Sequence, residues 1–359
     1  MQSLELFSFA STIENSKTCS QFALDSICGL STRVTILARS FMSMVGILQQ
    51  YITRYPVRSF MSKSSAYTYI GRQITNYLTV ENKMSFQEKY GPWTLVTGAA
   101  RGIGKAYAVE LASRGLNVLL VDVLQEELLQ TTEEIRSKFS VQCQCIQADL
   151  ANVLERQKFI DASEQYPIGL FCCNHAMTKL FVDGKLRAWI DTPIEDLQKM
   201  MQINLESSVA LIHHFANKMA TQRRGGILIL SSMGAISGAP YVTQYGATKA
   251  FLANLGEALF WELKHKGVDV TTVLPGLTRT KDVEKGLTAY GRKTLSMMEP
   301  FEVASISLNA LGKQCTVIPG KGNQLQHFFL SRLAPRSMSI SFFGKIFPKC
   351  FHVIPIENH

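Results

Sequence analysis

Tyr245 and Lys249 carry the clearest chemical signal in the sequence. They lie four residues apart, and residues 247–263 are rich in Ala, Leu and Glu, which favours a helix from about Thr243. On a helix this spacing places both side chains on one face. A neighbouring ammonium group favours the phenolate and lowers the pKa of a tyrosine from about 10. We therefore predict that Tyr245 exchanges protons and that Lys249 lowers its pKa.

Ser232 adds a hydroxyl group to this pair. It precedes Tyr245 by 13 residues (245 − 232) and follows the apolar run Ile227 to Leu230. At the C-terminal end of a buried strand, a hydroxyl group can hold a carbonyl oxygen. Tyr-x-x-x-Lys pairs also occur in ordinary helices as a packed ring and a solvated amine, so this prediction depends on motifs elsewhere in the chain.

A glycine-rich turn, TGAARGIG, lies upstream at residues 97–104 between an apolar stretch and an amphipathic one. Gly98 permits a tight turn, Gly102 lets the backbone approach a pyrophosphate, and Gly104 allows close contact between helix and sheet. The pattern predicts a dinucleotide-binding site.

Composition limits the class of protein. The chain has 359 residues, of which 46% are hydrophobic and 18% charged, with a net charge of +9. This composition is typical of a globular protein with a sizeable core. No basic stripe with interleaved aromatic residues is present, so we expect no nucleic-acid partner. The eight cysteines form neither a zinc motif nor a compact disulfide framework; four fall in predicted buried strands, and we expect a cytoplasmic location.

From Trp93 onward, short apolar segments alternate with longer amphipathic ones. This alternation predicts a parallel sheet covered on both faces by helices, an α/β fold of the Rossmann-type, doubly wound class. We expect seven strands, near 93–97, 117–121, 142–147, 168–173, 226–231, 268–274 and 315–318. Helices are expected near 103–114, 124–138, 152–165, 194–220, 244–266 and 301–312.

In order and spacing, these motifs resemble those of the classical short-chain dehydrogenase/reductase family over about residues 93–280. The likeness is greatest to its hydroxysteroid and 3-ketoacyl reductase-like branch. The glycine turn matches TGxxxGIG, and Pro275-Gly276-Leu277-Thr278-Arg279-Thr280 matches PGxxxT. Asp149 matches the adenine-contacting Asp and Asn204 the structural Asn, while Ser232, Tyr245 and Lys249 match the catalytic residues.

The resemblance implies an NAD(P)-dependent oxidoreductase that transfers a hydride between nicotinamide C4 and a ketone or secondary alcohol, without a metal. Ser232 would hold the substrate oxygen and Tyr245 would exchange its proton. Lys249 would also bind the nicotinamide ribose, and Asn204 would hold a water that relays protons. Thr280 would contact the carboxamide. The residues implied at the cofactor are Gly98, Arg101, Gly102, Ile103, Gly104, Asp122, Asp149, Asn174, Tyr245, Lys249, Pro275, Gly276 and Thr280.

Two neighbouring charges bear on the choice between NAD and NADP. Asp122 ends the second predicted strand, where a carboxylate accepts hydrogen bonds from the adenosine ribose and repels a 2′-phosphate, so it favours NAD. Arg101 acts in the opposite direction, because a guanidinium in the glycine turn can pair with that phosphate. We expect the effect of Asp122 to outweigh that of Arg101, so that NAD is preferred over NADP.

One motif departs from the family. The NNAG motif is replaced by Asn174-His175-Ala176-Met177. His175 can be interpreted as an added acid–base group or as a hydrogen-bonded structural substitute for Asn, and we favour the second because Tyr245 already supplies the proton. The change also supports an alternative function, a catalytically silent dinucleotide-binding scaffold or regulator. A second alternative is an epimerase or dehydratase on the same fold.

Residues 281–300 are predicted to form a substrate lid, or else a solvated connector. The methionines in this segment adapt to varied shapes, so we expect an apolar, lipid-like or steroid-like substrate. Tyr241 and His213 or His214 are further candidates near the site.

The ends of the chain differ from its middle. Residues 1–83 form an N-terminal extension in which Ser40 to Tyr55 can form an amphipathic helix, and Met84 can be a second start; the core domain is assigned to residues 84–320. Residues 321–359 combine aromatic and basic residues, which suits an interfacial membrane helix, a helix that covers the sheet, or a dimer interface. We expect the protein to form a homo-oligomer. Peripheral contact with a membrane is one of the options for the C-terminal segment.

Overall fold

The computed structural model describes residues 84–177, 181–182 and 185–354. The predictions for residues 1–83, including the amphipathic helix at Ser40 to Tyr55, lie outside this part. Met84 precedes a short helix, α5 (Phe86–Tyr90), that leads into the first strand.

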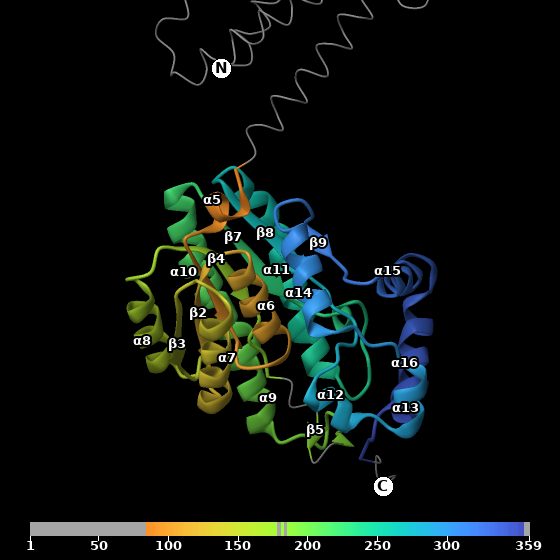
Figure 1. Cartoon of the computed structure of the whole chain (residues 1–359). Coiled ribbons are helices and arrows are strands. Elements are labelled where there is room, and N and C mark those ends of the chain that lie inside the picture. Colours follow the sequence, from red (N-terminus) through yellow and green to blue (C-terminus); the bar gives the residue numbers. More distant parts are fainter. Residues whose placement is uncertain (1–83, 178–180, 183–184, 355–359) are drawn as a thin grey trace, which may run out of the picture. The chain divides into compact units, whose positions relative to one another are not determined.

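Seven parallel strands form the central sheet, as predicted (Figure 1). Their order is β3-β2-β1-β4-β7-β8-β9, so the chain reverses its direction of winding between β1 and β4. In such sheets the ligand site lies at the carboxyl ends of the strands near this reversal. The strands are β1 (Trp93–Thr97), β2 (Asn117–Asp122), β3 (Cys143–Gln147), β4 (Ile168–Cys173), β7 (Gly225–Leu230), β8 (Val268–Val273) and β9 (Thr316–Val317).

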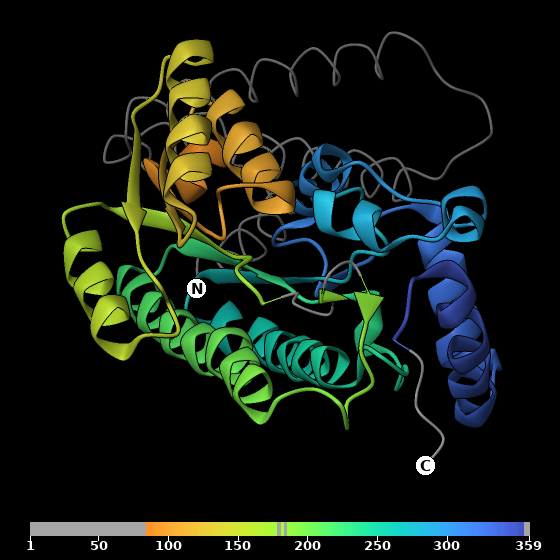
Figure 2. The ribbon, with the colours of Figure 1, turned by 90° about the horizontal axis from the view of Figure 1, so that it is seen from below.

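Apolar runs account for the sheet's burial on both faces. Every residue of β1, β4 and β7 is buried. One face packs against α6 (Gly102–Ser113), α7 (Gln125–Lys138) and α14 (Pro300–Ala310), and the other against α8 (Val153–Ser163), α10 (Ser207–Gln222) and α11 (Thr243–Lys264) (Figure 2). Of the strand cysteines, Cys143, Cys172 and Cys173 are buried, whereas Cys145 is only half-buried and corrects that expectation.

The predicted helix at 194–220 is present and extends to Gln222, but it contains a π-helical turn. It consists of α9 (Ile194–Met201), a π-helical turn (Gln202–Glu206) and α10. The wide turn is closed by a hydrogen bond from the Ser207 amide to the Gln202 carbonyl oxygen. Asn204 lies within it and is fully buried. Such turns often mark functional sites.

Two short helices, α12 (Lys281–Gly286) and α13 (Ala289–Thr294), occupy the predicted lid segment, and β5 (Phe181–Val182) pairs with β6 (Lys185–Leu186). After β9 the chain forms α15 (Lys321–Phe328), a π-helical turn (Phe329–Leu333) and α16 (Arg336–Cys350). The end of α16 packs with residues of the predicted lid segment in a cluster separate from the two sheet cores. Of the alternatives for residues 321–359, a helix that covers the sheet does not match this packing. No helix in the described ranges is both long and apolar enough to cross a membrane.

Candidate active site

The glycine turn connects β1 to α6 and has the backbone that a pyrophosphate needs. Gly98 and Gly102 have φ angles of 67° and 59°, a region that favours glycine. A side chain at Gly104 would overlap the carbonyl oxygen of Gly98, so helix and turn are in direct contact. No side chain caps the first amides of α6, which begins at Gly102, so they can bind an anion. Ile103 packs against the core beside them.

Asn174 and His175 fix this turn from the end of β4. The Asn174 side-chain amide donates to the carbonyl oxygens of Thr97 and Gly98, at 3.1 and 3.0 Å. His175 is buried, and its two ring nitrogens lie 2.8 Å from the hydroxyl oxygens of Thr97 and Ser207. Burial lowers the pKa of His175 to about 3, so the imidazole is neutral. Both ring nitrogens are used in hydrogen bonds that join β1 to α10.

Asp122 and Arg101 both have partners within the protein. The Asp122 carboxylate accepts hydrogen bonds from the amides of Ala100 (2.9 Å) and Leu124 (3.1 Å). It therefore stands at the glycine turn, at the end of β2. Arg101 forms an exposed ion pair of 3.1 Å with Asp282 of α12, in the predicted lid segment.

Asp149 lies after β3 and is part of a local turn. Its carboxylate accepts a 3.0 Å hydrogen bond from the Ala151 amide, and its second oxygen lies 3.9 Å from the Lys199 ammonium. No contact among the described residues joins it to Ser232, Tyr245 or Lys249.

Ser232, Tyr245 and Lys249 meet at the carboxyl end of β7. The Lys249 ammonium is buried, donates a 2.7 Å hydrogen bond to the Leu230 carbonyl oxygen, and lies 5.7 Å from the centroid of the Tyr245 ring. The Ser232 hydroxyl accepts a 3.0 Å hydrogen bond from the Gly234 amide. A hydrogen bond between the Ser232 and Tyr245 side chains favours the phenolate form of Tyr245. The predicted arrangement of the three side chains is present.

The predicted direction of the Tyr245 pKa shift is wrong. Removal of the phenol from water raises its pKa, and the contact with Ser232 opposes this only in part. Lys249 does not lower it, because its ammonium is bound to Leu230 rather than to the phenol oxygen. Burial also lowers the pKa of Lys249, to about 8.

Asn204 is held by three hydrogen bonds beneath Tyr245. Its carboxamide oxygen accepts from the Met177 amide (2.7 Å), and its nitrogen donates to the Met177 carbonyl oxygen (3.3 Å) and the Thr248 hydroxyl (3.1 Å). Thr248 in turn donates to the Tyr245 carbonyl oxygen at 2.8 Å. The π-helical turn is thereby joined to the first turn of α11 and to the altered loop that ends at Met177.

The PGxxxT segment lies across from the glycine turn. The Pro275 carbonyl oxygen accepts a 2.9 Å hydrogen bond from the Met233 amide, next to Ser232. A methyl group placed on Gly102 would lie 3.5 Å from the Thr280 methyl carbon, so the two loops converge. A side chain on Gly276 would meet Asn323 of α15 at 2.5 Å, which shows that the C-terminal helices reach this loop.

A groove beside Tyr245 contains residues that sequence analysis missed. Tyr241 lines it, as suspected, and so do two residues after β6, Arg187 and Trp189. No motif in the sequence identifies Arg187 and Trp189 as groove residues; they are recognised only because the fold brings them close to Tyr245. His213 and His214 are elsewhere, bonded to Asn217 and Glu164 respectively.

Comparison with known proteins agrees with this geometry. The family model described as short chain dehydrogenase matches residues 92–289. A 7beta-hydroxysteroid dehydrogenase of Collinsella aerofaciens is 32% identical over 247 residues, which cover 67% of this chain and 90% of that protein. The very-long-chain 3-oxoacyl-CoA reductase of Homo sapiens is 30% identical over 237 residues, 66% of this chain and 73% of the relative.

A solved structure of a 7beta-hydroxysteroid dehydrogenase, studied for its stereoselectivity, is also similar. It superposes with a TM-score of 0.66 at 30% identity, over 72% of this chain and 99% of the other. The match of the family model, which spans more than half of the chain, agrees with the parallel sheet and its glycine turn. The chain therefore belongs to the short-chain dehydrogenase family and is an NAD(P)-dependent oxidoreductase that acts on a ketone or alcohol.

Proposed function

We propose that the enzyme interconverts a bulky apolar ketone and its secondary alcohol, with Tyr245 as the proton donor and acceptor. The observation that carries this proposal is the meeting of Tyr245 and Ser232 at the end of β7, beside a groove lined by Trp189, Leu197 and Met200. The names of the two relatives, a hydroxysteroid dehydrogenase and a very-long-chain 3-oxoacyl-CoA reductase, support a steroid-like or acyl substrate.

In the proposed mechanism, bound nicotinamide supplies or accepts a hydride at its C4. Tyr245 gives a proton to the substrate oxygen in the reducing direction, while the Ser232 hydroxyl holds that oxygen. A raised pKa keeps the phenol protonated at neutral pH, which suits this direction. Lys249, fixed by Leu230, places its cation at the ring and can bind the nicotinamide ribose. Asn204 positions the first turn of α11 through Thr248, and its predicted water relay stays a proposal.

The dinucleotide fits the residues that are present. The uncapped first turn of α6 would hold the pyrophosphate, and the convergence of Gly102 with Thr280 places the PGxxxT segment beside it. Asp122 would accept hydrogen bonds from the adenosine ribose, and we propose NAD as the preferred form. The pairing of Arg101 with Asp282 supports this choice, because the guanidinium already has an anionic partner.

The location and assembly of the enzyme stay predictions. The six cysteines between residues 143 and 350 are all free, which supports a reducing, cytoplasmic environment. A homo-oligomer and the lid function of residues 281–300 likewise remain proposals.

The absorbance of NADH and NADPH, followed with a panel of steroid ketones, 3-oxoacyl thioesters and their alcohols, tests this function. We expect turnover with at least one bulky apolar substrate, and its loss in Tyr245→Phe. Nucleotide binding without any change in absorbance across the panel would indicate a scaffold. Product formed without net consumption of nucleotide would indicate an epimerase or dehydratase.

A further inference from the structure

The helices after β9 expose an unusual amount of apolar surface. Neither α15 nor the π-helical turn that follows it contains a buried residue, and α16 buries only Ser339 and Cys350. By comparison, α14 buries five of its eleven residues. Seven large apolar side chains between residues 325 and 342 are 41 to 70% exposed, namely Leu325, Phe328, Phe329, Leu333, Met338, Ile340 and Phe342. We call these seven residues the C-terminal apolar surface.

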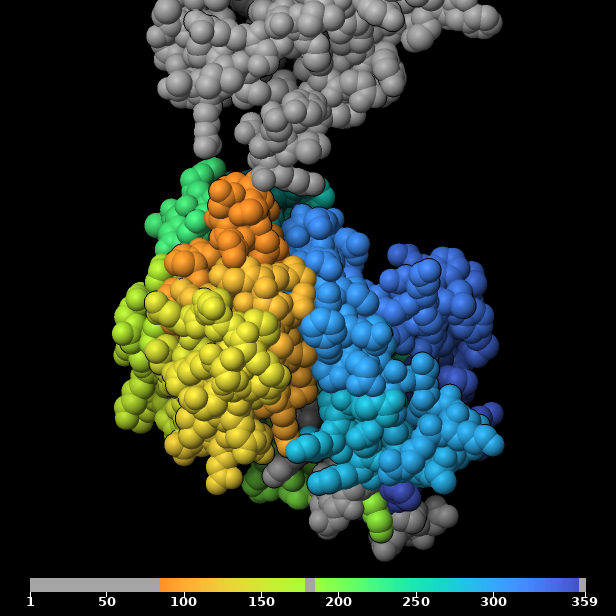
Figure 3. All heavy atoms as spheres, in the orientation of Figure 1, coloured from red at the N-terminus to blue at the C-terminus, as the bar shows by residue number. Residues whose placement is uncertain are grey.

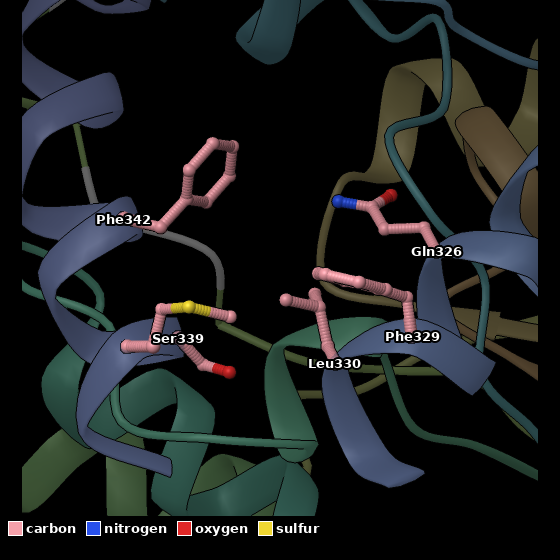
Figure 4. A pocket seen from close by; sticks show the side chains of 6 residues that line it. Gln326, Phe329, Leu330, Ser339 and Phe342 are labelled. Carbon is pink, nitrogen blue, oxygen red and sulfur yellow. The ribbon is translucent and has the colours of Figure 1, made fainter. Parts of the chain in front are cut away.

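An open groove divides this surface. It has a volume of about 370 Å³ and is lined by Gln326, Phe329 and Leu330 on one side and by Met338, Ser339 and Phe342 on the other. Figure 4 shows these side chains facing one another from two helices. In Figure 3 the blue C-terminal helices stand out from the rest of the described surface. The four apolar side chains among them, those of Phe329, Leu330, Met338 and Phe342, can accept a hydrocarbon chain.

The charged side chains of the helices that carry this surface are all basic, although Glu257 of α11 lies near His327 of α15. From residue 303 to residue 356 the sequence contains no Asp or Glu. Five basic side chains in the same helices are exposed, namely Lys321, Arg332, Arg336, Lys345 and Lys349. If two copies of the chain met through this surface, they would bring these like charges together. A surface of anionic lipid headgroups over hydrocarbon would instead match both the cations and the exposed rings.

We propose that the C-terminal apolar surface docks on an anionic lipid membrane. Docking inserts Phe328, Phe329 and Leu333 at the level of the acyl chains, while Arg332 and Arg336 contact the headgroups. The described part of the enzyme is then held at the membrane surface without a helix of its own that spans the bilayer.

The docked helices are continuous with the substrate side of the enzyme. The amide of Thr288, between α12 and α13, donates to the Cys350 carbonyl oxygen (2.9 Å), and the His352 amide donates to that of Gly286 (2.9 Å). The Leu186 amide donates to the His352 carbonyl oxygen at 2.7 Å. Leu186 and Tyr241 also share the apolar cluster that contains the end of α16. This part of the inference rests on the proposed function: an apolar substrate dissolved in the bilayer has a short route to the groove at Tyr245.

Vesicle flotation of the full chain tests docking without measuring turnover. We use phosphatidylcholine vesicles with and without 30% phosphatidylserine. The wild type should float with the anionic vesicles, and Phe328→Ser/Phe329→Ser/Leu333→Ser should lower the partition coefficient at least tenfold. Arg332→Gln/Arg336→Gln should lower it about thirtyfold on anionic vesicles only. The matched controls are Phe251→Ser/Trp261→Ser on α11 and Lys264→Gln/Lys266→Gln at and just after its end. They remove similarly exposed side chains and should float like the wild type.

Equal flotation of the triple variant and the wild type, or no flotation of either, would overturn docking by this surface. A concentration-dependent dimer that dissociates in the triple variant, with flotation unchanged, would assign the surface to a second copy. Docking can hold even if no steroid or acyl substrate is turned over, so failure of the proposed function is recognised separately by the absorbance assay.

Discussion

The Lys249 ammonium donates a 2.7 Å hydrogen bond to the Leu230 carbonyl oxygen and faces the Tyr245 ring at 5.7 Å from its centroid. The cation is thus fixed to the end of strand β7 and not to the phenol oxygen. Tyr245 consequently keeps the raised pKa that burial imposes. The phenol is therefore suited to donating a proton, whereas the ammonium is the buried group that titrates nearer to neutral pH.

Replacement of Tyr245 by Phe should abolish proton transfer and leave nucleotide binding intact. General acid catalysis contributes about 10²- to 10⁴-fold, so kcat should fall by at least about 10²-fold. NADH affinity, measured by fluorescence titration, should change by less than about threefold, as expected for the loss of one ordinary contact. Tyr166→Phe, whose ring packs against Trp93 away from the site, is the control and should behave like the wild type. Full activity in Tyr245→Phe would refute the assigned role.

Lys249 should make the protein more stable at alkaline pH. Its folded pKa of about 8 lies below its ordinary value of 10.5, so the unfolded chain binds the extra proton between these values and stability rises with pH across that window. Relative to Lys249→Met, the free energy of unfolding of the wild type should increase by about 3 kcal/mol between pH 8 and 10.5. Urea denaturation of both proteins at a series of pH values measures this difference. A difference independent of pH would show that the ammonium is not destabilised by burial.

His175 should lower stability in acid without taking part in the reaction. Because its pKa falls to about 3 in the folded protein, the unfolded chain binds a proton below the ordinary value of 6.5 and stability decreases as pH falls. At pH 5 this amounts to about 2 kcal/mol relative to pH 7. His175→Asn should lose correspondingly less stability over that range in urea denaturation, and its kcat at pH 7 should stay within about threefold of the wild type. A hundredfold loss of kcat in a folded His175→Asn would instead make the imidazole an acid–base group.

Asp282 should influence the choice of nucleotide through Arg101. The pair is exposed, so Asp282→Asn should change stability by less than about 1 kcal/mol. It frees the guanidinium to bind a 2′-phosphate, so kcat/KM for NADPH should rise relative to NADH, by about tenfold for one charge-assisted contact. Glu284→Gln, on the same helix but paired with Arg279, is the matched control and should keep the ratio unchanged. An unchanged ratio in Asp282→Asn would mean that Arg101 does not read the phosphate.

Sequence patterns predicted the sheet well because its central strands, such as Ile168–Cys173, are mostly apolar runs buried on both faces. They also predicted the grouping of Ser232, Tyr245 and Lys249. Tyr245 and Lys249 lie one turn apart on the same helix and Ser232 directly follows a predicted strand, and both features can be seen in the local sequence. The partner of Lys249 was not predictable, because Leu230 is 19 residues away and only folding brings its carbonyl oxygen to the ammonium. The sign of the Tyr245 pKa shift was wrong because burial of the phenol, which outweighs its contact with Ser232, likewise arises only from folding.

The π-helical turn at Gln202–Glu206 was missed because its residues are ordinary helix formers. It is fixed by contacts from outside the helix, chiefly those of Asn204 with Met177 and Thr248. The hydrogen bonds of His175 to Thr97 and Ser207 likewise join three separate elements. Long-range contacts of this kind leave no periodicity in the sequence.

The π-helical turn at Gln202–Glu206 also determines which side chains of α10 face the core. An α-helix advances about 100° per residue, and a π turn holds one residue more than an α turn. If one residue between Gln202 and Glu206 were deleted, α9 and α10 could merge into a single straight rod. In the merged helix, rotation about the helix axis would turn Leu211 and Phe215 away from the core and bring neighbouring polar side chains toward it. The extra residue thus keeps Leu197 and Met200 of α9 at the groove beside Tyr245 while Leu211 and Phe215 of α10 stay in the core.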